Sequence, residues 1–376
     1  MAERQAEVAG APTTDMATAD ATWDYRDRHD GFARTYFRAF GDCVVSSVGV
    51  GTYLGEPTDA ADNAYREALV EAVESGVNVV DTAINYRCQR SERVVGTAIA
   101  EADVDREAVM VATKGGFIPF DGSRPDDPGR YVREEYLDPG LVDREDLVGG
   151  RHCLAPAFID DQVDRSLSNL GLEAIDLYYL HNPETQLQER SREAVYDQLE
   201  AAFETLERRV QAGDIRHYGV ATWEAFRVER GSESYLSLPE VVERARSAAE
   251  TVGSAATGLR AIQLPFNVYM ADAFTVAAHD TPDGAKSALW FANDAGLDVF
   301  TSASLMQGRL ATEMPEDVAA KLEGETHAQR AINFARSAPG VTSALVGTGS
   351  PEHVAENVAA GTYEPLGAEA FDAVFE

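Results

Sequence analysis

The amino-acid sequence predicts an α/β fold of the (β/α)8 TIM-barrel type, in which eight parallel strands alternate with helices and close into a barrel. Eight short apolar runs occur in order along the chain, and each is followed by a stretch with helical periodicity. The runs are apolar throughout, which is typical of parallel strands buried on both faces. An open, doubly wound sheet is the alternative, but the Gly-x-Gly-x-x-Gly turn that often follows its first strand is absent from this sequence.

The predicted elements follow each other with little intervening chain, except after the third strand. The strands are expected at residues 47–52, 77–83, 108–114, 175–181, 217–222, 261–267, 298–304 and 343–349. The helical stretches that follow them are 59–76, 91–102, 158–171, 192–213, 238–252, 285–296, 326–338 and 351–360. Four of these helices are expected to end at a glycine, and Pro351 suits the first turn of the last one.

The barrel domain is expected to cover residues 41–376, after a loose N-terminal extension over residues 1–40. The extension is rich in Ala, Thr and Asp, and it lacks the basic start and apolar centre of a secretory signal. Residues 115–155 are too long for a simple turn and are rich in Gly, Pro, Asp and aromatic residues. We interpret them as a long active-site loop that acts as a lid, with a surface insertion as the alternative.

The chain carries a formal net charge of −32, and only three of its 32 basic residues are lysines. So acidic a protein repels phosphate backbones and anionic lipids, and no apolar run is long enough to span a bilayer, so we expect neither nucleic acid nor membrane as a partner. Because the charge is spread along the chain, we favour a halophilic protein, in a cytoplasm whose salt screens the repulsion. The three cysteines lack Cys-x-x-Cys spacing, which predicts reduced thiols, a cytoplasmic location and no metal site.

Polar side chains lie where three consecutive predicted strands end. Asp81 and Tyr86 follow the second strand, Lys114 ends the third and His181 ends the fourth. Each has an ordinary alternative, since an Asp can cap a turn, a Lys can be solvated and a His can be structural. Lys114, however, directly follows an apolar strand in a chain that nearly lacks lysine, which indicates a need for its compact ammonium. Active sites of barrels lie at the carboxyl ends of the strands, so we expect these four residues to meet.

The four side chains have complementary chemistry. Asp81 can neutralise a buried Lys114, and an ammonium beside the Tyr86 phenol is expected to lower the phenol's pKa from about 10. A neutral His181 can hold an oxygen atom by a hydrogen bond. The set predicts proton transfer to or from a carbonyl or alcohol oxygen, and any hydride has to come from a cofactor.

Several separated motifs resemble those of the aldo-keto reductases. The segment GVNVVDTAINYRCQRSERVVG resembles the family's stretch of Asp, Tyr and a Ser-Glu pair, while VMVATKGG and IDLYYLHNPE resemble its lysine and histidine strands. HYGVATW, QLPFN, FTSASLMQGRL and VGTGSPEHVAENVAA resemble its later strands and cofactor-binding tail. The resemblance covers roughly residues 45–360. It implies a (β/α)8 barrel that binds a nicotinamide dinucleotide without a Rossmann fold.

The resemblance also implies roles for individual residues. Tyr86 would be the general acid in reduction and the base in oxidation, tuned by Lys114 and Asp81, and His181 would orient the substrate carbonyl. Tyr53 and Trp223 are expected to line the substrate pocket, and loop packing is the alternative for these and other aromatic residues. The implied cofactor-binding positions are Thr52, Thr222, Gln263, Ser302, Ser304, Leu305, Gln307, Gly347, Thr348, Gly349, His353, Glu356 and Asn357. An NAD(P)-binding redox sensor or accessory subunit with little turnover is the alternative function.

Three departures from the family pattern concern the cofactor. Thr222 stands where an Asn usually holds the nicotinamide carboxamide, and Ser302 stands where a Tyr often stacks on the ring. Gly347 and His353 stand where basic residues would hold the 2′-phosphate of NADP, so the strongest charge-assisted bonds are missing. Family habit favours NADP (NADPH) and these residues favour NAD, so we expect NADP with NAD left open. The substrate, among sugars, small aldehydes and ketones, and the oligomeric state stay open.

Overall fold

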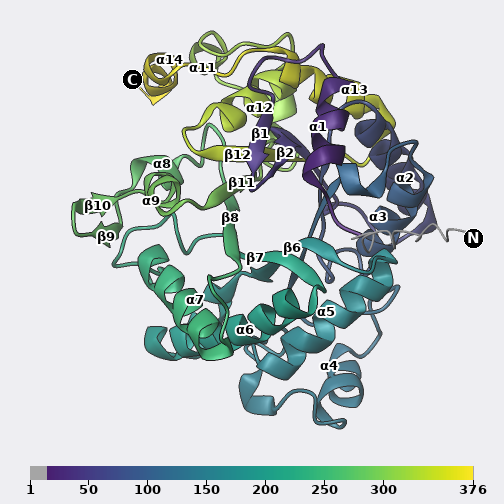
Figure 1. Ribbon diagram of the computed structural model, residues 1–376, viewed down its shortest axis with the longest axis vertical. Coiled ribbons are helices and arrows are strands. Elements are labelled where there is room, and N and C mark those ends of the chain that lie inside the picture. The colour runs from purple at the N-terminus through teal and green to yellow at the C-terminus, as the bar shows by residue number, and fades with distance from the viewer. Residues whose placement is uncertain (1–14, 376) are drawn as a thin grey trace, which may run out of the picture.

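The structure, a computed structural model that describes residues 15–375, confirms the predicted barrel. Eight parallel strands close in the order β11–β12–β3–β4–β5–β6–β7–β8, and Figure 1 shows them enclosed by helices. Every predicted strand overlaps an observed one. The barrel strands are β3 (Val48–Gly51), β4 (Val79–Asp81), β5 (Met110–Gly115), β6 (Ile175–His181), β7 (Ile215–Ala221), β8 (Leu259–Pro265), β11 (Asp298–Ser302) and β12 (Val341–Gly347).

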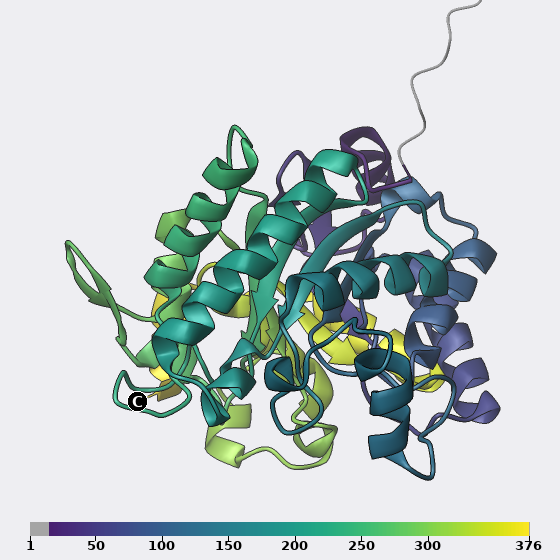
Figure 2. The same cartoon turned by 90° about the horizontal axis from the view of Figure 1, so that it is seen from below.

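Long helices run side by side across the outside of the barrel (Figure 2). They are α2 (Asp59–Glu74), α3 (Arg90–Glu101), α5 (Pro156–Leu170), α6 (Arg192–Ala212), α7 (Leu238–Val252), α9 (Ala288–Ala295), α12 (His327–Ser337) and α13 (Pro351–Ala359). Gly171 and Gly213 end α5 and α6 with φ of 65° and 86°, as the sequence predicts. In the described part of the chain, no helix combines the length and apolar character that crossing a membrane requires.

Shorter helices and a hairpin lie in the loops that connect these strands and helices. They are the helices α8 (Asp272–Thr275), α10 (Arg309–Thr312), α11 (Glu316–Ala319) and α14 (Ala368–Asp372), and the hairpin of β9 (His279–Thr281) and β10 (Gly284–Lys286).

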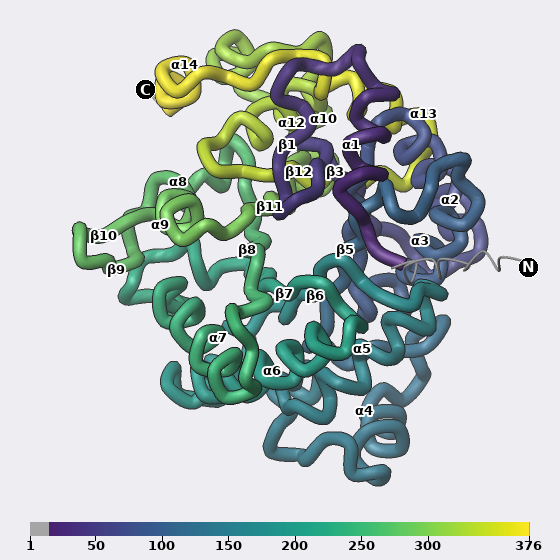
Figure 3. Tube along the Cα trace, viewed as in Figure 1, coloured from purple at the N-terminus to yellow at the C-terminus, as the bar shows by residue number. Residues whose placement is uncertain are grey.

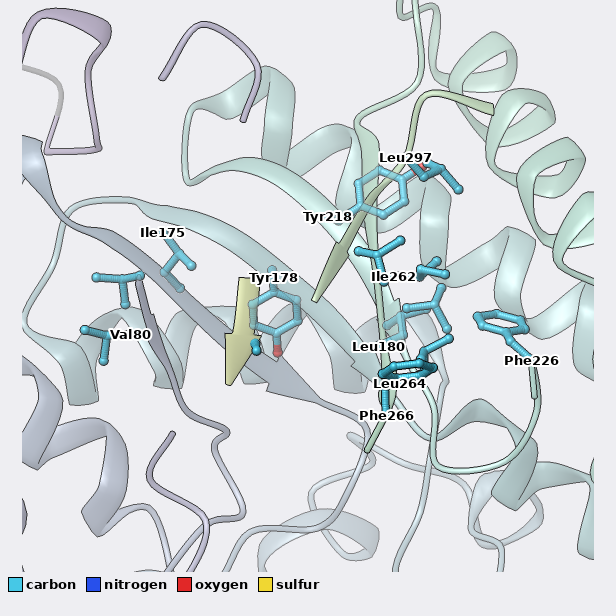
Figure 4. Close-up of a cluster of buried hydrophobic side chains, with 14 of the residues drawn as sticks. Val80, Ile175, Tyr178, Leu180, Tyr218, Phe226, Ile262, Leu264, Phe266 and Leu297 are labelled. Carbon is cyan, nitrogen blue, oxygen red and sulfur yellow. The ribbon is translucent and has the colours of Figure 1, made fainter. Parts of the chain in front are cut away.

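The core has two layers, one inside the barrel and one between the barrel and its helices. A hairpin of β1 (Phe37–Phe40) and β2 (Cys43–Ser46) contributes Phe40 and Val45 to the inner cluster, where they pack with residues of the barrel strands. Figure 4 shows part of the outer layer, including Leu180 of β6 and Ile262 and Leu264 of β8. The barrel interior is therefore filled with side chains and is no pore, and the chemistry lies at the carboxyl ends of the strands.

The described part of the predicted loose extension is folded, which corrects the expectation for residues 15–40. Helix α1 (Ala19–Asp27) begins at the cap Thr18, and the fully buried Tyr25 donates a hydrogen bond to the Val73 carbonyl at 2.5 Å. Tyr36 is also fully buried and stacks on Phe32, with ring centroids 3.9 Å apart. The sequence-based prediction missed this packing because the region is polar overall and contains only a few aromatic residues. Residues 1–14 lie outside the described residues.

The long segment 115–155 is ordered and has a small core of its own. It contains α4 (Pro128–Val132), a π-helical turn (Arg133–Leu137) and a 3-10 turn (Arg144–Asp146). Tyr136 is fully buried, its ring centroid lies 5.7 Å from that of Phe158 on α5, and its hydroxyl reaches the Pro119 carbonyl at 3.3 Å. In Figure 3 the part that carries α4 lies at the edge of the molecule beside α5.

Candidate active site

Asp81 and Lys114 form a buried ion pair at the carboxyl ends of the adjacent strands β4 and β5. Lys114 Nζ lies 2.5 Å from Asp81 Oδ1 and donates a second hydrogen bond to the Thr82 carbonyl at 2.8 Å. The second oxygen of Asp81, Oδ2, accepts a hydrogen bond from Gln263 Nε2 at 2.8 Å. Burial raises the pKa of Asp81 and lowers that of Lys114, while the attraction between the two charges opposes both shifts.

Two glycines directly after Lys114 allow the chain to turn away in a crowded place. A Cβ on Gly115 would lie 2.2 Å from the hydroxyl of Tyr178, so any other residue would force the buried Tyr178 side chain to move. Gly116 has a φ of 135° and donates its N–H to Gln162 Oε1 at 2.6 Å. These contacts fix the end of β5 and thereby the position of the lysine.

Tyr86 and His181 lie at the same mouth of the barrel. The ammonium of Lys114 lies 4.9 Å from the centroid of the Tyr86 ring, and the His181 ring centroid is 5.8 Å from that of Tyr86. The ring of Tyr53 meets Tyr86 edge-on with centroids 5.0 Å apart. The structure therefore brings together the four residues that the sequence marks at strand ends.

The pKa of Tyr86 is raised well above 10, so the expectation that Lys114 lowers it is wrong. Burial is the largest cause, and the negative charge of Asp81 adds to it. Since Asp81 already compensates the ammonium, the ion pair attracts a phenolate less strongly than a lone ammonium would, and too weakly to offset the effect of burial. Burial also lowers the pKa of His181 well below 6.5, with the charge of Lys114 as the second cause. Near pH 7 the site thus holds a neutral phenol and a neutral imidazole.

A turn of three consecutive left-handed residues, Arg87–Gln89, follows Tyr86, with φ of 47°, 58° and 67°. This conformation costs about 1–2 kcal/mol for each non-glycine residue, so the surroundings must hold it. Arg87 does so by donating to the carbonyl of Glu56 at 3.2 Å and by pairing with Asp62. It thereby ties the loop that follows Tyr53 to the turn that follows Tyr86. Sequence reasoning missed Arg87, because its partners lie 25 to 31 residues earlier and no local pattern marks it.

Two of the predicted cofactor positions have hydroxyl groups that are free to bind a ligand. Thr222, just after β7, and Ser304, after β11, are buried, and their side-chain oxygens have no hydrogen-bond partner within residues 15–375. A buried hydroxyl without a partner costs free energy, and a polar ligand at this mouth would relieve the cost. Both groups therefore suit a polar cofactor.

Four other predicted cofactor positions use their side chains within the protein. Thr52 Oγ1 bonds to Thr82 Oγ1 at 2.9 Å, and Gln263 holds Asp81 as described above. Asn357 Nδ2 on α13 donates to Thr348 Oγ1 at 2.9 Å and fixes the chain between β12 and that helix. Their side chains thus shape the site, whether or not they also contact a ligand.

The remaining predicted positions line two segments, one after β11 and one after β12. Ser302 and Gly347 are the last residues of their strands, and Gln307 is exposed with a φ of 55°. A Cβ on Gly349 would lie 3.0 Å from the ring of Tyr65, so the chain passes close to α2 here. The others are Leu305, which is half-buried, and His353 and Glu356 on α13, of which His353 is exposed.

The predicted substrate residues Tyr53 and Trp223 are exposed by 57% and 45%, which leaves both rings available to a ligand. Glu184, a buried residue that sequence reasoning missed, holds the loop of Trp223. Its Oε1 accepts the N–H of Trp223 at 2.7 Å and that of Glu224 at 3.0 Å. The sequence could have indicated this residue, because Glu184 follows His181 by three residues and lies in the turn directly after the same strand.

The fold and the site define a class of protein, an eight-stranded α/β barrel with titratable side chains gathered at the carboxyl ends of its strands. The sequence pattern of the Aldo/keto reductase family matches residues 47–241. The matched region runs from β3 into α7 and contains Asp81, Tyr86, Lys114 and His181. The chain belongs to the aldo/keto reductase family, as the resemblance predicts.

Related proteins match parts of the chain or its fold. An uncharacterized oxidoreductase, YqkF, of Bacillus subtilis is 31% identical over 182 residues, 48% of this chain and 46% of that protein. The NADH-specific methylglyoxal reductase of Escherichia coli is 30% identical over 145 residues, 37% of this chain and 39% of that protein. The chain thus spans less than half the length of these two relatives. An aldo/keto reductase of Klebsiella pneumoniae, solved with NADP and acetate, shares the fold with a TM-score of 0.59 and 20% identity, over 91% of this chain and 94% of that one.

Proposed function

We propose that the protein is an NAD(P)-dependent oxidoreductase that interconverts a carbonyl and an alcohol, with Tyr86 as general acid and base. The observation that carries this proposal is the placement of the Tyr86 phenol beside both the buried Asp81–Lys114 pair and the ring of His181. Family membership and the oxidoreductases among its relatives support the same reaction. The substrate is a small carbonyl compound, and a dicarbonyl such as methylglyoxal, named for one relative, is a reasonable first probe.

The residues at the barrel mouth fit a nicotinamide dinucleotide. The free hydroxyl of Thr222 would hold the nicotinamide amide, and that of Ser304 would bond to another polar group of the cofactor. The N-terminus of α13, with His353 in its first turn, would receive the adenosine end. The nicotinamide supplies the hydride that no side chain can supply.

The chain's own residues carry the proton. During reduction His181 donates one hydrogen bond to the substrate oxygen and orients the carbonyl. Its Nδ1 is buried without a partner among the described residues, so we place the single ring proton on Nε2. As the carbonyl carbon gains a hydride, Tyr86 transfers its phenolic proton to the oxygen and an alcohol forms. The ammonium of Lys114 then stabilises the phenolate until a proton returns from solvent, and oxidation reverses each step.

Titrating the protein with NADPH and with NADH, and following nicotinamide fluorescence, tests the cofactor assignment. We expect tighter binding of NADPH, which agrees with the cofactor of the Klebsiella structure. Thr222→Val is expected to weaken both cofactors by about 2- to 10-fold, since one hydrogen bond is lost. His353→Ala is expected to weaken NADPH alone. Equal or tighter binding of NADH would mean that the absence of Lys and Arg at this end decides the preference, and binding of neither would refute the cofactor assignment.

We also propose that the protein works in a cytoplasm of high salt. Its arginines are outnumbered by carboxylates, and Arg244 alone lies within 2.9 Å of Glu193, Asp197, Glu200 and Glu240. A net charge of −32 opposes the compact state, and screening shortens the range of this repulsion from about 10 Å at 0.1 M salt to about 3 Å at 1 M.

The unfolding midpoint is therefore expected to rise as KCl increases from 0.1 M to 2 M. Thermal denaturation followed by circular dichroism measures it. Sucrose at equal osmolality is the control, because it is excluded from the protein surface but screens no charge. An equal rise in sucrose, or no rise in KCl, would contradict electrostatic screening as the cause.

A further inference from the structure

His152, at the inner edge of the long segment 115–155, is joined to the backbone of His181. Its Nε2 lies 2.8 Å from the His181 carbonyl oxygen, to which it donates, and its Nδ1 accepts from Gln186 Nε2 at 2.7 Å. Both ring nitrogens are thus engaged, which fixes one neutral tautomer. The side chain is fully buried, and burial lowers its pKa to about 4, so it stays neutral at physiological pH.

The contact between the two histidines is built from several parts of the chain. A Cβ on Gly116 would lie 3.1 Å from the His181 carbonyl oxygen and 3.2 Å from His152 Nε2, so only glycine fits without a shift. The ring of Phe117 packs edge-on against both imidazoles, with centroids 4.7 Å from His152 and 5.1 Å from His181. The Cys153 N–H donates to the Gly116 carbonyl at 2.8 Å and closes the segment on itself.

The other ring nitrogen of His152, Nδ1, is also held by a buried side chain, that of Gln186. Gln186, in a 3-10 turn (Pro183–Gln188) shortly after β6, is fully buried and accepts from Arg190 Nε at 2.9 Å while it donates to His152. Arg190 in turn donates to the Glu145 carbonyl, which returns the chain of hydrogen bonds to the long segment. His181 itself leads into Asn182, whose φ of 50° turns the chain at the strand end.

We infer that His152 is a positioning residue for His181, and that this edge of segment 115–155 is a fixed wall of the active site. The inference rests on the proposed function, since it assigns the direction of the His181 ring to His152. The anchored carbonyl sets the backbone at the end of β6, and Phe117 closes one side of the ring. The imidazole that orients the substrate carbonyl is thereby held by a residue that touches no substrate.

The kinetic test compares His152→Leu, His152→Gln and a matched control, His279→Leu. His279 is also fully buried and also uses both ring nitrogens, with Nε2 2.9 Å from the Phe226 carbonyl and Nδ1 accepting from the Leu238 N–H at 3.2 Å. We expect His152→Leu to lower kcat about tenfold or more, because a misplaced catalytic group slows the reaction, while the Kd for NADPH stays unchanged. His152→Gln keeps a donor at the place of Nε2 and is expected to recover most of the rate. His279→Leu is expected to lose stability but to keep kcat.

Histidine ring ¹⁵N resonances give a readout that does not depend on turnover. The His181 signals are expected to shift in His152→Leu and to stay unchanged in His279→Leu. If the wild-type protein turns over no carbonyl, the proposed function fails and these signals still decide the positioning role. If His152→Leu does not fold, Gln186→Met removes the donor to His152 and is expected to shift the same signals. Unchanged His181 signals in folded His152→Leu or Gln186→Met, or an equal loss of kcat in His279→Leu, would overturn the inference.

Discussion

Replacing Tyr86 with phenylalanine is expected to lower kcat for carbonyl reduction by about 10²- to 10⁴-fold, the usual contribution of a positioned general acid. The substitution removes one hydroxyl and keeps the ring that contacts Tyr53 and His181. Binding of NADPH and the unfolding midpoint are therefore expected to stay close to those of the wild-type protein. Steady-state kinetics with a panel of small aldehydes and ketones, beside the fluorescence titration, separates the two effects.

Tyr53→Phe is the matched control, since it removes the same atom from a ring whose centroid is 5.0 Å away. This hydroxyl has no place in the proton transfer, so the change is expected to affect KM more than kcat. A Tyr86→Phe protein with normal kcat would show that another group, or water, delivers the proton.

The reduction rate is also expected to depend on pH in a defined way. Because the pKa of Tyr86 is raised well above 10, the phenol stays protonated, and therefore active as an acid, from pH 6 to 9. The pKa of His181 is lowered well below 6.5, so this ring stays neutral over the same range. The kcat for reduction should be flat there. A fall in the rate above pH 7 would mean that the pKa of Tyr86 is lowered in the complex with cofactor. The sequence alone predicts a lowered pKa for a phenol beside an unpaired ammonium.

The sequence predicts the barrel well because its buried strands have a simple sequence pattern. Strands such as β6 are covered on both faces, so they appear as continuous apolar runs whose polar ends mark the mouth. The N-terminal region has no such apolar pattern. Its two anchors, Tyr25 and Tyr36, lie in a polar stretch, and their contacts with Val73 and with Val48 and Ile332 show that the region packs on the barrel domain.

The sequence predicts which residues lie at strand ends, but it does not predict the contacts between residues that are far apart in the chain. Gln263 and Asp81 are 182 residues apart in the chain, and their hydrogen bond follows from closure of the barrel. His152 has no metal-ligand spacing and no strand of its own, so its contact with His181 depends on how segment 115–155 folds back. The shift of the Tyr86 pKa was predicted in the wrong direction for a related reason. The sequence indicates a lysine near the phenol, but the net charge at the ring depends on how closely Asp81 pairs with that lysine.

Replacing Lys114 with methionine is expected to lower the free energy of unfolding by about 3–5 kcal/mol, because it leaves Asp81 charged and buried without its partner. Asp81→Asn is expected to cost a similar amount by stranding the ammonium. The double variant, in which neither charge remains, should lose less than the sum of the two. Lys114→Arg keeps the charge, but the larger planar group does not fit the place between Asp81 and the Thr82 carbonyl, so little rescue is expected. Urea denaturation of these four variants and of the wild-type protein at constant KCl measures the differences.

Arg66→Met is the control, since Arg66 pairs with Glu101 at 2.5 Å on the surface, where such pairs contribute at most about 1 kcal/mol. If the single variants Lys114→Met and Asp81→Asn were no less stable than this control, the pair would not be buried as the structure places it. Additive losses in the double variant would mean that the two charges do not compensate each other. Tyr86 would then face an uncompensated ammonium, and its pKa should fall below 10. The thermodynamic cycle therefore tests the reason given for the neutral phenol as well as the stability of the pair.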